Sequence, residues 1–178
     1  MNLNIHYHIN NEYSISMNIK IIKSDISNWR EFRKIRLESL RCEPEAFTSS
    51  LKKTEEYSDE YWIDMVSDIN NIVLLAFVDK TVVGIIRAAL IDEDVKEGTA
   101  FIGSFYVNIN YRKQGIGKLL MDELINRIKE NSEIYAVRLW VGIKQFDAIN
   151  FYESYGFKKV NEEIKDGKKE LVFEKIIR

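Results

Sequence analysis

The residues best suited to chemistry lie in a short basic turn past the middle of the chain. From Val107 the sequence reads VNINYRKQGIG, so that Arg112 and Lys113 precede two glycines, Gly115 and Gly117. A turn of this kind that opens a helix presents unpaired backbone amides and the positive end of the helix dipole, and both suit a phosphate group. The glycines let a ligand approach the backbone without a Cβ in the way.

A glycine pair alone is a weak signal, and two common phosphate-binding motifs do not fit it. The Rossmann motif requires a third glycine where Leu120 stands. The P-loop requires Ser or Thr after Gly117-Lys118, where Leu119 follows instead. A nucleotide-binding regulatory domain therefore remains an alternative that rests on the turn alone.

A second segment lies downstream of the turn. A strand over residues 135–141 is predicted to lead into a helix over residues 146–155, which Gly156 ends in a left-handed conformation. The segment follows the pattern Leu139-x-Val141-x-x-x-Gln145-x-x-Ala148-x-x-Phe151-Tyr152-x-x-x-Gly156-Phe157.

Together the two segments resemble the acetyl-CoA site of the GNAT N-acetyltransferase superfamily. Residues 112–117 follow the family pattern Arg/Gln-x-x-Gly-x-Gly/Ala, with Lys113 where many relatives have glycine. The second segment follows the family's second motif, with Gln145 in place of the usual Asn. The resemblance implies a GNAT fold: an α/β (α+β) domain with one mixed, mostly antiparallel twisted sheet, flanked by helices, in which a splayed strand pair forms the CoA cleft. It also implies acetyl-CoA as cosubstrate and direct transfer to a primary amine in a ternary complex.

The resemblance also implies roles for individual residues. The strand before the turn would pair with the pantetheine arm, and the backbone N–H near Val107 would donate to the thioester carbonyl. Tyr152 would be the general acid that protonates the departing thiolate, since a phenol with a pKa of ~10 is protonated at neutral pH. The alternative is that Tyr152 only packs. The implied cofactor-binding residues are Phe105, Tyr106, Val107, Arg112, Lys113, Gln114, Gly115, Ile116, Gly117, Lys118 and Gln145.

The sequence does not identify a general base. Many relatives place a glutamate on the strand before the turn, but residues 102–106 (IGSFY) contain no carboxylate. Three alternatives stay open: water relayed by Ser104 or backbone carbonyls, a carboxylate such as Glu55 or Glu56, or an acceptor with a lowered pKa. The acceptor pocket is expected from the first two helices and their connection, residues 43–50.

The predicted elements place these segments in one domain. A helix is expected from Ser27 or Asn28 to about Arg41, and a second after Ser58, with Asp59 and Glu60 in its first turn. Strands are predicted over 72–78, 81–90 and 99–107, a helix from about 116 to 128, and a hairpin over 157–164 and 169–176 around Asp166-Gly167. This order predicts a single α/β domain over residues 17–178 with a largely antiparallel sheet. Residues 1–16 would be an extension, an added strand or an upstream start.

The composition of the chain argues against several kinds of functional site. The chain has 26 basic and 28 acidic residues, so no global basic field indicates nucleic acid. Cys42 is the one cysteine, which excludes an intramolecular disulfide, and it is expected to be partly buried. His6 and His8 are the two histidines, and their place near the N-terminus disfavours a catalytic triad or a metal site.

The expected setting and partners follow from these points. No apolar run approaches the roughly 18 residues of a membrane span, and no signal-peptide pattern opens the chain, so a cytoplasmic protein without membrane partners is expected. The expected acceptor is an amine on a small molecule or a peptide, with no nucleic acid and no metal involved. A homodimer is possible. The rival from another class is a non-catalytic acyl-CoA-binding sensor, supported by the missing strand carboxylate.

Overall fold

The computed structural model describes residues 3–7, 17–91, 97–165 and 167–178. These residues form one eight-stranded sheet of order β1-β2-β3-β4-β5-β6-β8-β7, antiparallel except between β5 and β6. The strands are β1 (Leu3–Tyr7), β2 (Met17–Lys23), β3 (Asn71–Val78), β4 (Thr81–Ala89), β5 (Thr99–Val107), β6 (Ala136–Gly142), β7 (Lys158–Lys165) and β8 (Lys168–Ile176). The helices are α1 (Trp29–Cys42), α2 (Leu51–Glu55), α3 (Asp59–Ser67), α4 (Ile116–Ile128) and α5 (Phe146–Ser154), with 3-10 turns η1 (Pro44–Ala46) and η2 (Ile109–Tyr111).

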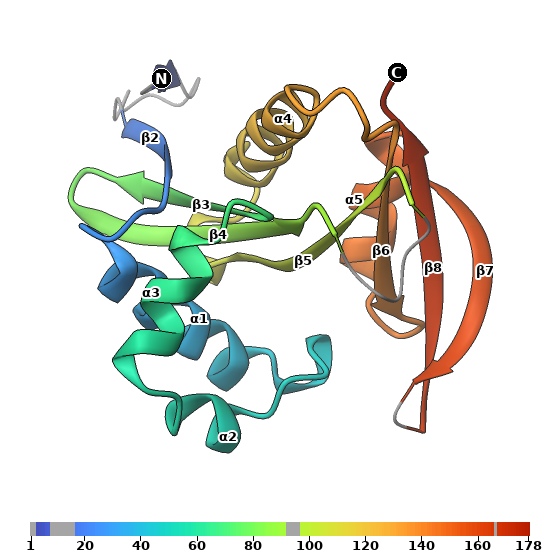
Figure 1. Cartoon of the computed structure of the whole chain (residues 1–178), viewed down its shortest axis with the longest axis horizontal. Coiled ribbons are helices and arrows are strands. Elements are labelled where there is room, and N and C mark those ends of the chain that lie inside the picture. Colours follow the sequence, from blue (N-terminus) through green and yellow to red (C-terminus); the bar gives the residue numbers. More distant parts are fainter. Residues whose placement is uncertain (1–2, 8–16, 92–96, 166) are drawn as a thin grey trace, which may run out of the picture.

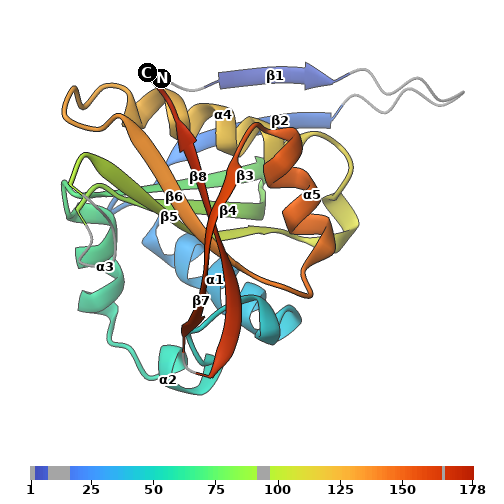
Figure 2. The same cartoon turned by 90° about the vertical axis from the view of Figure 1, so that its right-hand side faces the viewer.

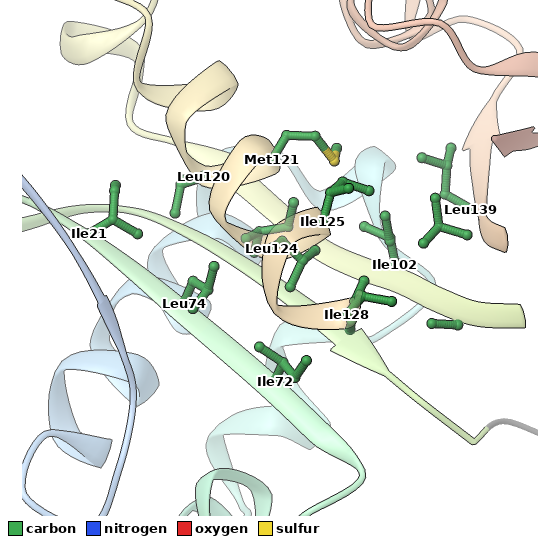
Figure 3. Packing of buried hydrophobic residues seen from close by; sticks show 14 of the residues in the cluster. Ile21, Ile72, Leu74, Ile102, Leu120, Met121, Leu124, Ile125, Ile128 and Leu139 are labelled. Carbon is green, nitrogen blue, oxygen red and sulfur yellow. The ribbon is translucent and has the colours of Figure 1, made fainter. Parts of the chain in front are cut away.

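Helices cover both faces of the sheet. Figure 1 shows α4 on one side and α1 to α3 on the other, and Figure 2 shows α5 on the same side as α4. The alternation of side chains along β3 explains this arrangement, because Leu74 lies in the core under α4 whereas Val73 and Leu75 lie in the core under α1 and α3. In Figure 3, Leu120, Leu124 and Ile128 of α4 lie over the sheet near Leu74.

Most predicted elements are confirmed within two residues. Ser58 caps α3 by accepting a bond from the Tyr61 amide, as its position predicted. The short helix α2, capped by Ser50, was not predicted, because five residues are too few to show a helical hydrophobic period. Of the predicted hairpin turn, Asp166 lies outside the described residues. The expectation that Cys42 is partly buried is wrong: its side chain is exposed at the end of α1.

The N-terminal strand β1 pairs in antiparallel fashion with β2, from Leu3 opposite Ile21 to Tyr7 opposite Met17. The structure therefore has a strand within the first 16 residues, at the outer edge of the sheet. The division of the chain at residue 16 stays a prediction.

The sheet opens between β5 and β6. The two strands pair in parallel over only three residues each, Thr99–Phe101 with Ala136–Arg138. Beyond these pairs β5 follows β4 and β6 follows β8, so residues 102–107 and 139–142 part from one another. We call this parting the β5–β6 fork. The splayed strand pair that the resemblance implies is thus confirmed.

Candidate cofactor and acceptor site

The end of β5 directs one backbone amide toward the fork. The Asn108 amide donates to the Val83 carbonyl of β4 at 2.8 Å, and Tyr106 lies opposite Ile85. Since the residues bonded to one neighbour alternate along an antiparallel strand, Val107 turns its N–H and C=O away from β4. The Val107 carbonyl accepts a bond from Arg112 Nε at 2.8 Å on that side. The Val107 N–H therefore faces the fork.

A β-bulge in β5 sets the orientation of the residues before Val107. The register with β4 shifts so that Ser104 and Phe105 together stand opposite Ile86, and Ser104 has a φ of 52°. Bulges of this kind bend a strand and redirect its side chains, and a non-glycine residue with positive φ is strained by about 1–2 kcal/mol. Phe105 consequently packs on the α4 face, and Tyr106 packs on the α1 face.

The turn before α4 has the backbone conformation of an anion-binding site. Lys113 and Gly115 both have positive φ, 60° and 81°, and Gly115 is the N-cap of α4. Within the described residues, the amides of Lys113, Gln114, Gly115, Ile116 and Gly117 have no hydrogen-bond partner. Five successive free donors at the N-terminus of a helix fit the pyrophosphate of a CoA molecule.

Arg112 and Lys118, two of the three basic side chains of this turn, are engaged within the protein. Besides its bond to Val107, Arg112 pairs through its guanidinium with Glu43 Oε1 at 2.7 Å. Lys118 pairs with Asp122 at 2.7 Å, one turn along α4. The Arg112 side chain thus fixes the end of β5 to the chain after α1. Within the described residues, the free donors of the turn are therefore the backbone amides and the Lys113 side chain.

Tyr152 lies beneath this turn, in the core between α5 and the sheet. Its ring lies 6.1 Å from that of Phe105, 5.7 Å from that of Phe157 and 6.4 Å from that of Phe173. Phe105 in turn lies under the start of α4, where a Cβ added to Gly117 would lie 3.3 Å from Phe105 Cζ. The packing therefore ties α5, the end of β5 and the start of α4 into one unit.

Burial controls the chemistry of the Tyr152 hydroxyl. Desolvation raises the pKa of Tyr152 above its ordinary value, so the phenol stays protonated at neutral pH. No residue of the described part of the chain accepts a hydrogen bond from this hydroxyl. Its oxygen is not completely buried, since it is absent from the polar atoms that are both buried and unpaired. The Tyr152 hydroxyl is thus a protonated donor without a hydrogen-bond partner in the described chain.

The chain that follows α1 crosses from one arm of the fork to the other. We call residues 43–46 the strap. On the β5 side Glu43 pairs with Arg112. On the β6 side Gln145 Nε2 donates to the Glu45 carbonyl at 3.1 Å, and Lys168 pairs with the Glu45 carboxylate at 3.1 Å. Gln145, which the resemblance assigned to the cofactor, thus holds the strap in this structure.

A carboxylate that the sequence did not single out lies beside the end of β5. Glu38 Oε1 accepts bonds from Asn108 Nδ2 at 2.7 Å and from the Tyr106 hydroxyl at 3.2 Å. Burial, followed by the hydrogen bond with Cys42 and the charge of Glu38, raises the pKa of Tyr106 above its ordinary value. The helical period of α1 gave no signal for this role, because Glu38 approaches residues about 70 positions away in the sequence.

The base candidates taken from the sequence lie in different surroundings. Glu55 pairs with Arg41 at 3.2 Å, and both side chains are about half exposed. Glu56 is exposed after α2. Ser104 occupies the bulge of β5, within reach of the fork by its place in the strand. No hydrogen bond joins Glu55 or Glu56 to the end of β5 in the described chain, whereas Glu38 bonds to both neighbours of Val107.

Three further observations concern metal sites, membrane-spanning helices and surface hollows. Among the described residues, no three His, Cys, Asp or Glu side chains are grouped closely enough to hold a metal ion. No helix of the described chain has the length and apolar character needed to cross a membrane. Two shallow surface hollows, of about 240 and 190 Å³, lie along the exposed side of α1 and share Arg30 and Lys34.

The forked sheet, with a helix N-terminus at its opening, defines the fold of the GNAT acetyltransferases. A model of the Acetyltransferase (GNAT) family matches residues 29–157, which contain both arms of the fork and the turn before α4. The chain belongs to this family.

Curated proteins with similar sequences also carry the names of N-acetyltransferases. A "Probable N-acetyltransferase san" of Drosophila melanogaster is 26% identical over 105 residues, which are 59% of this chain and 56% of that protein. A "Spermine/spermidine N(1)-acetyltransferase" of Bacillus subtilis is 29% identical over 83 residues, which are 47% of this chain and 55% of that protein. The chain thus spans just over half the length of the curated relatives it matches.

Solved structures show the same fold over nearly the whole chain. The PaiA N-acetyltransferase of Thermoplasma acidophilum, solved in complex with coenzyme A, has a TM-score of 0.66 and is 24% identical, with 90% of this chain and 99% of that chain covered. An acetyltransferase of the GNAT family from Streptococcus pneumoniae has a TM-score of 0.71 and is 17% identical, with 89% and 99% covered.

Proposed function

We propose that this protein is an N-acetyltransferase that transfers the acetyl group of acetyl-CoA directly to a primary amine in a ternary complex. The observation that carries the proposal is the run of five free amides, from Lys113 to Gly117, at the point where β5 and β6 part. Membership of the GNAT family supports it. In this proposal the amides bind the pyrophosphate, and the Val107 N–H stabilises the oxyanion that forms at the thioester carbonyl.

In this proposal Tyr152 stabilises the sulfur of the leaving group. Because burial raises its pKa, Tyr152 donates a hydrogen bond to the departing thiolate at any pH near neutrality. An unperturbed thiol has a pKa of ~8.5, below that of the phenol, so stabilisation by a hydrogen bond is favoured over complete proton transfer. The role agrees with a hydroxyl that has no partner in the described chain.

Direct transfer is favoured over an acyl-enzyme route by the surroundings of Cys42. The neighbour of this thiol is the Tyr106 hydroxyl, whose raised pKa makes it unsuitable as a base that would activate a nucleophile. The amine therefore attacks the thioester itself. The polyamine named for the Bacillus subtilis relative makes spermine a first acceptor to test.

The deciding experiment is calorimetric titration with acetyl-CoA, with ATP and NAD as controls, followed by a thiol-release assay with spermine and two peptides, one offering a free N-terminus and one a lysine. Selective binding at a Kd of about 1 μM or below, with release of CoA that depends on an amine, supports the enzyme. Selective binding without turnover favours the acyl-CoA-binding sensor. Equal binding of ATP would favour the nucleotide-binding domain and contradict the proposal.

A further inference from the structure

We propose that Glu38 binds the ammonium group of the acceptor amine and takes the first proton from it, so that the carboxylate absent from β5 is supplied by α1. This inference rests on the proposed function, since it names the class of acceptor and the base for the same reaction. It starts from the two bonds that Glu38 Oε1 accepts, from Asn108 Nδ2 and the Tyr106 hydroxyl.

The first step of the argument is position. Tyr106 and Asn108 are the residues on either side of Val107, whose N–H faces the fork. A carboxylate held by both neighbours of Val107 is fixed over the end of β5, on the α1 face of the sheet. The strap, which is part of the connection where the acceptor pocket was expected, begins five residues after Glu38.

The second step is charge. Each nearby carboxylate on the strap and on α2 has a cationic partner: Glu43 has Arg112, Glu45 has Lys168 and Glu55 has Arg41. Glu38 has neutral donors only within the described chain, so its negative charge is left without a counter-ion. A half-buried carboxylate in this condition gains stability when a cation binds. A protonated primary amine supplies that cation.

The third step concerns Oε2, the second oxygen of the Glu38 carboxylate. Both bonds from the protein go to Oε1, and no described residue donates to Oε2. The raised pKa of Tyr106 keeps its hydroxyl a donor, so Tyr106 holds Glu38 and does not compete with it as a base. An ionised carboxylate accepts several hydrogen bonds, and Oε2 is free for an N–H of the substrate.

The reaction balances with this one base. The ammonium nitrogen gives one proton to Glu38 while its lone pair forms the C–N bond to the acetyl carbonyl carbon. The C–S bond then breaks, and its electron pair stays on the sulfur of CoA. The second proton of the nitrogen neutralises the thiolate, and Glu38 releases its own proton to solvent. The products are the N-acetyl amide and CoA.

The test compares three variants whose charge and length differ in a controlled way. Glu38→Gln keeps an oxygen that accepts bonds from Tyr106 and Asn108 but removes the charge, whereas Glu38→Asp keeps the charge and shortens the side chain. Glu130→Gln removes the same charge from an exposed position just after α4, at the end of that helix away from the turn, and is the matched control. Steady-state rates with spermine and the two peptides are measured beside the acetyl-CoA Kd and the melting temperature of each variant.

We expect kcat/KM for the preferred amine to fall about 100-fold or more in Glu38→Gln, because both general-base catalysis and the charge that binds the amine are lost. Glu38→Asp is expected to retain more activity than Glu38→Gln, and Glu130→Gln to match the wild type. The acetyl-CoA Kd should be unchanged in all three. A purely structural role predicts the reverse order, with Gln harmless and Asp harmful.

The outcomes separate this inference from the proposed function. If the wild type binds no acetyl-CoA, the proposed function fails at its first step. If it binds acetyl-CoA and acetylates an amine while Glu38→Gln is equally active, only the role of Glu38 is overturned. A wild type that binds acetyl-CoA but acetylates none of the three amines also overturns it, because the inferred ammonium site would then have no function.

Discussion

The two sides of the β5–β6 fork are built from different parts of the chain. On the cofactor side, the turn from Lys113 to Gly117 offers backbone amides, and its conformation depends on local positive φ angles. On the acceptor side, Glu38 and the strap offer side chains that are held by partners far away in the sequence. The proposed cofactor site is thus made of backbone groups from one short segment, whereas the proposed acceptor site is made of side chains that the fold brings together.

The cofactor side should be the more easily destroyed by one substitution. Gly115→Val places a β-branched residue at a φ of 81°, and strain of up to about 3 kcal/mol corresponds to about a 100-fold rise in the acetyl-CoA Kd when the turn yields. Calorimetric titration measures this. Gly167→Val is the matched control, since Gly167 has a φ of 74° at the β7–β8 turn and open space around its Cβ position. The control should lose stability only; equal Kd values in both variants would show that the turn does not bind the cofactor.

A smaller effect is expected from Tyr152, which lies below the turn that we propose to bind acetyl-CoA. Tyr152→Phe removes a donor to a developing charge, worth about 2 kcal/mol or about 30-fold in kcat, while the acetyl-CoA Kd stays within about twofold. Thiol release and calorimetry separate the two quantities. Tyr155→Phe, at the C-cap of the same helix, is the control, because the Tyr155 hydroxyl already donates a hydrogen bond to Asp122. Equal kcat values for wild type and Tyr152→Phe would leave Tyr152 a packing residue.

Arg112 joins the two sides, and its loss should affect both. Its guanidinium contacts the Val107 carbonyl and the Glu43 carboxylate, so Arg112→Ala loosens the end of β5 and the strap together. We expect KM for acetyl-CoA and KM for the amine each to rise about 5- to 10-fold. Arg41→Ala, which breaks an exposed pair with Glu55, is the control and should change neither. A rise in only one KM would show that the two sides are independent.

The same contrast explains how far the sequence could be interpreted. The glycine spacing and the second motif lie within about 50 residues. They predicted the turn and the position of Tyr152 in α5, and the family resemblance that they carry implied the fork. The contact of Glu38 with Tyr106 joins residues 68 positions apart, and it forms only because α1 packs across the carboxyl end of β5. No hydrophobic period or spacing rule encodes such a pair. Arg112 lies at the turn, and its long side chain reaches Glu43 by a path that spacing alone does not reveal. Its assignment to the cofactor stays a prediction.

The smallest effect is expected at the outer end of the strap. Lys168 pairs with Glu45, whose side chain is 87% exposed, and exposed ion pairs contribute little. Lys168→Ala should therefore change KM for the amine by about twofold, and the difference from wild type should disappear in 0.5 M salt, which shortens the screening length to about 4 Å. Gln145, which holds the same strap through the Glu45 backbone, keeps it in place in this variant. A change of 20-fold or more that persists in high salt would mean that the strap is fixed at the hairpin, and that the acceptor side is as rigid as the turn that binds the cofactor.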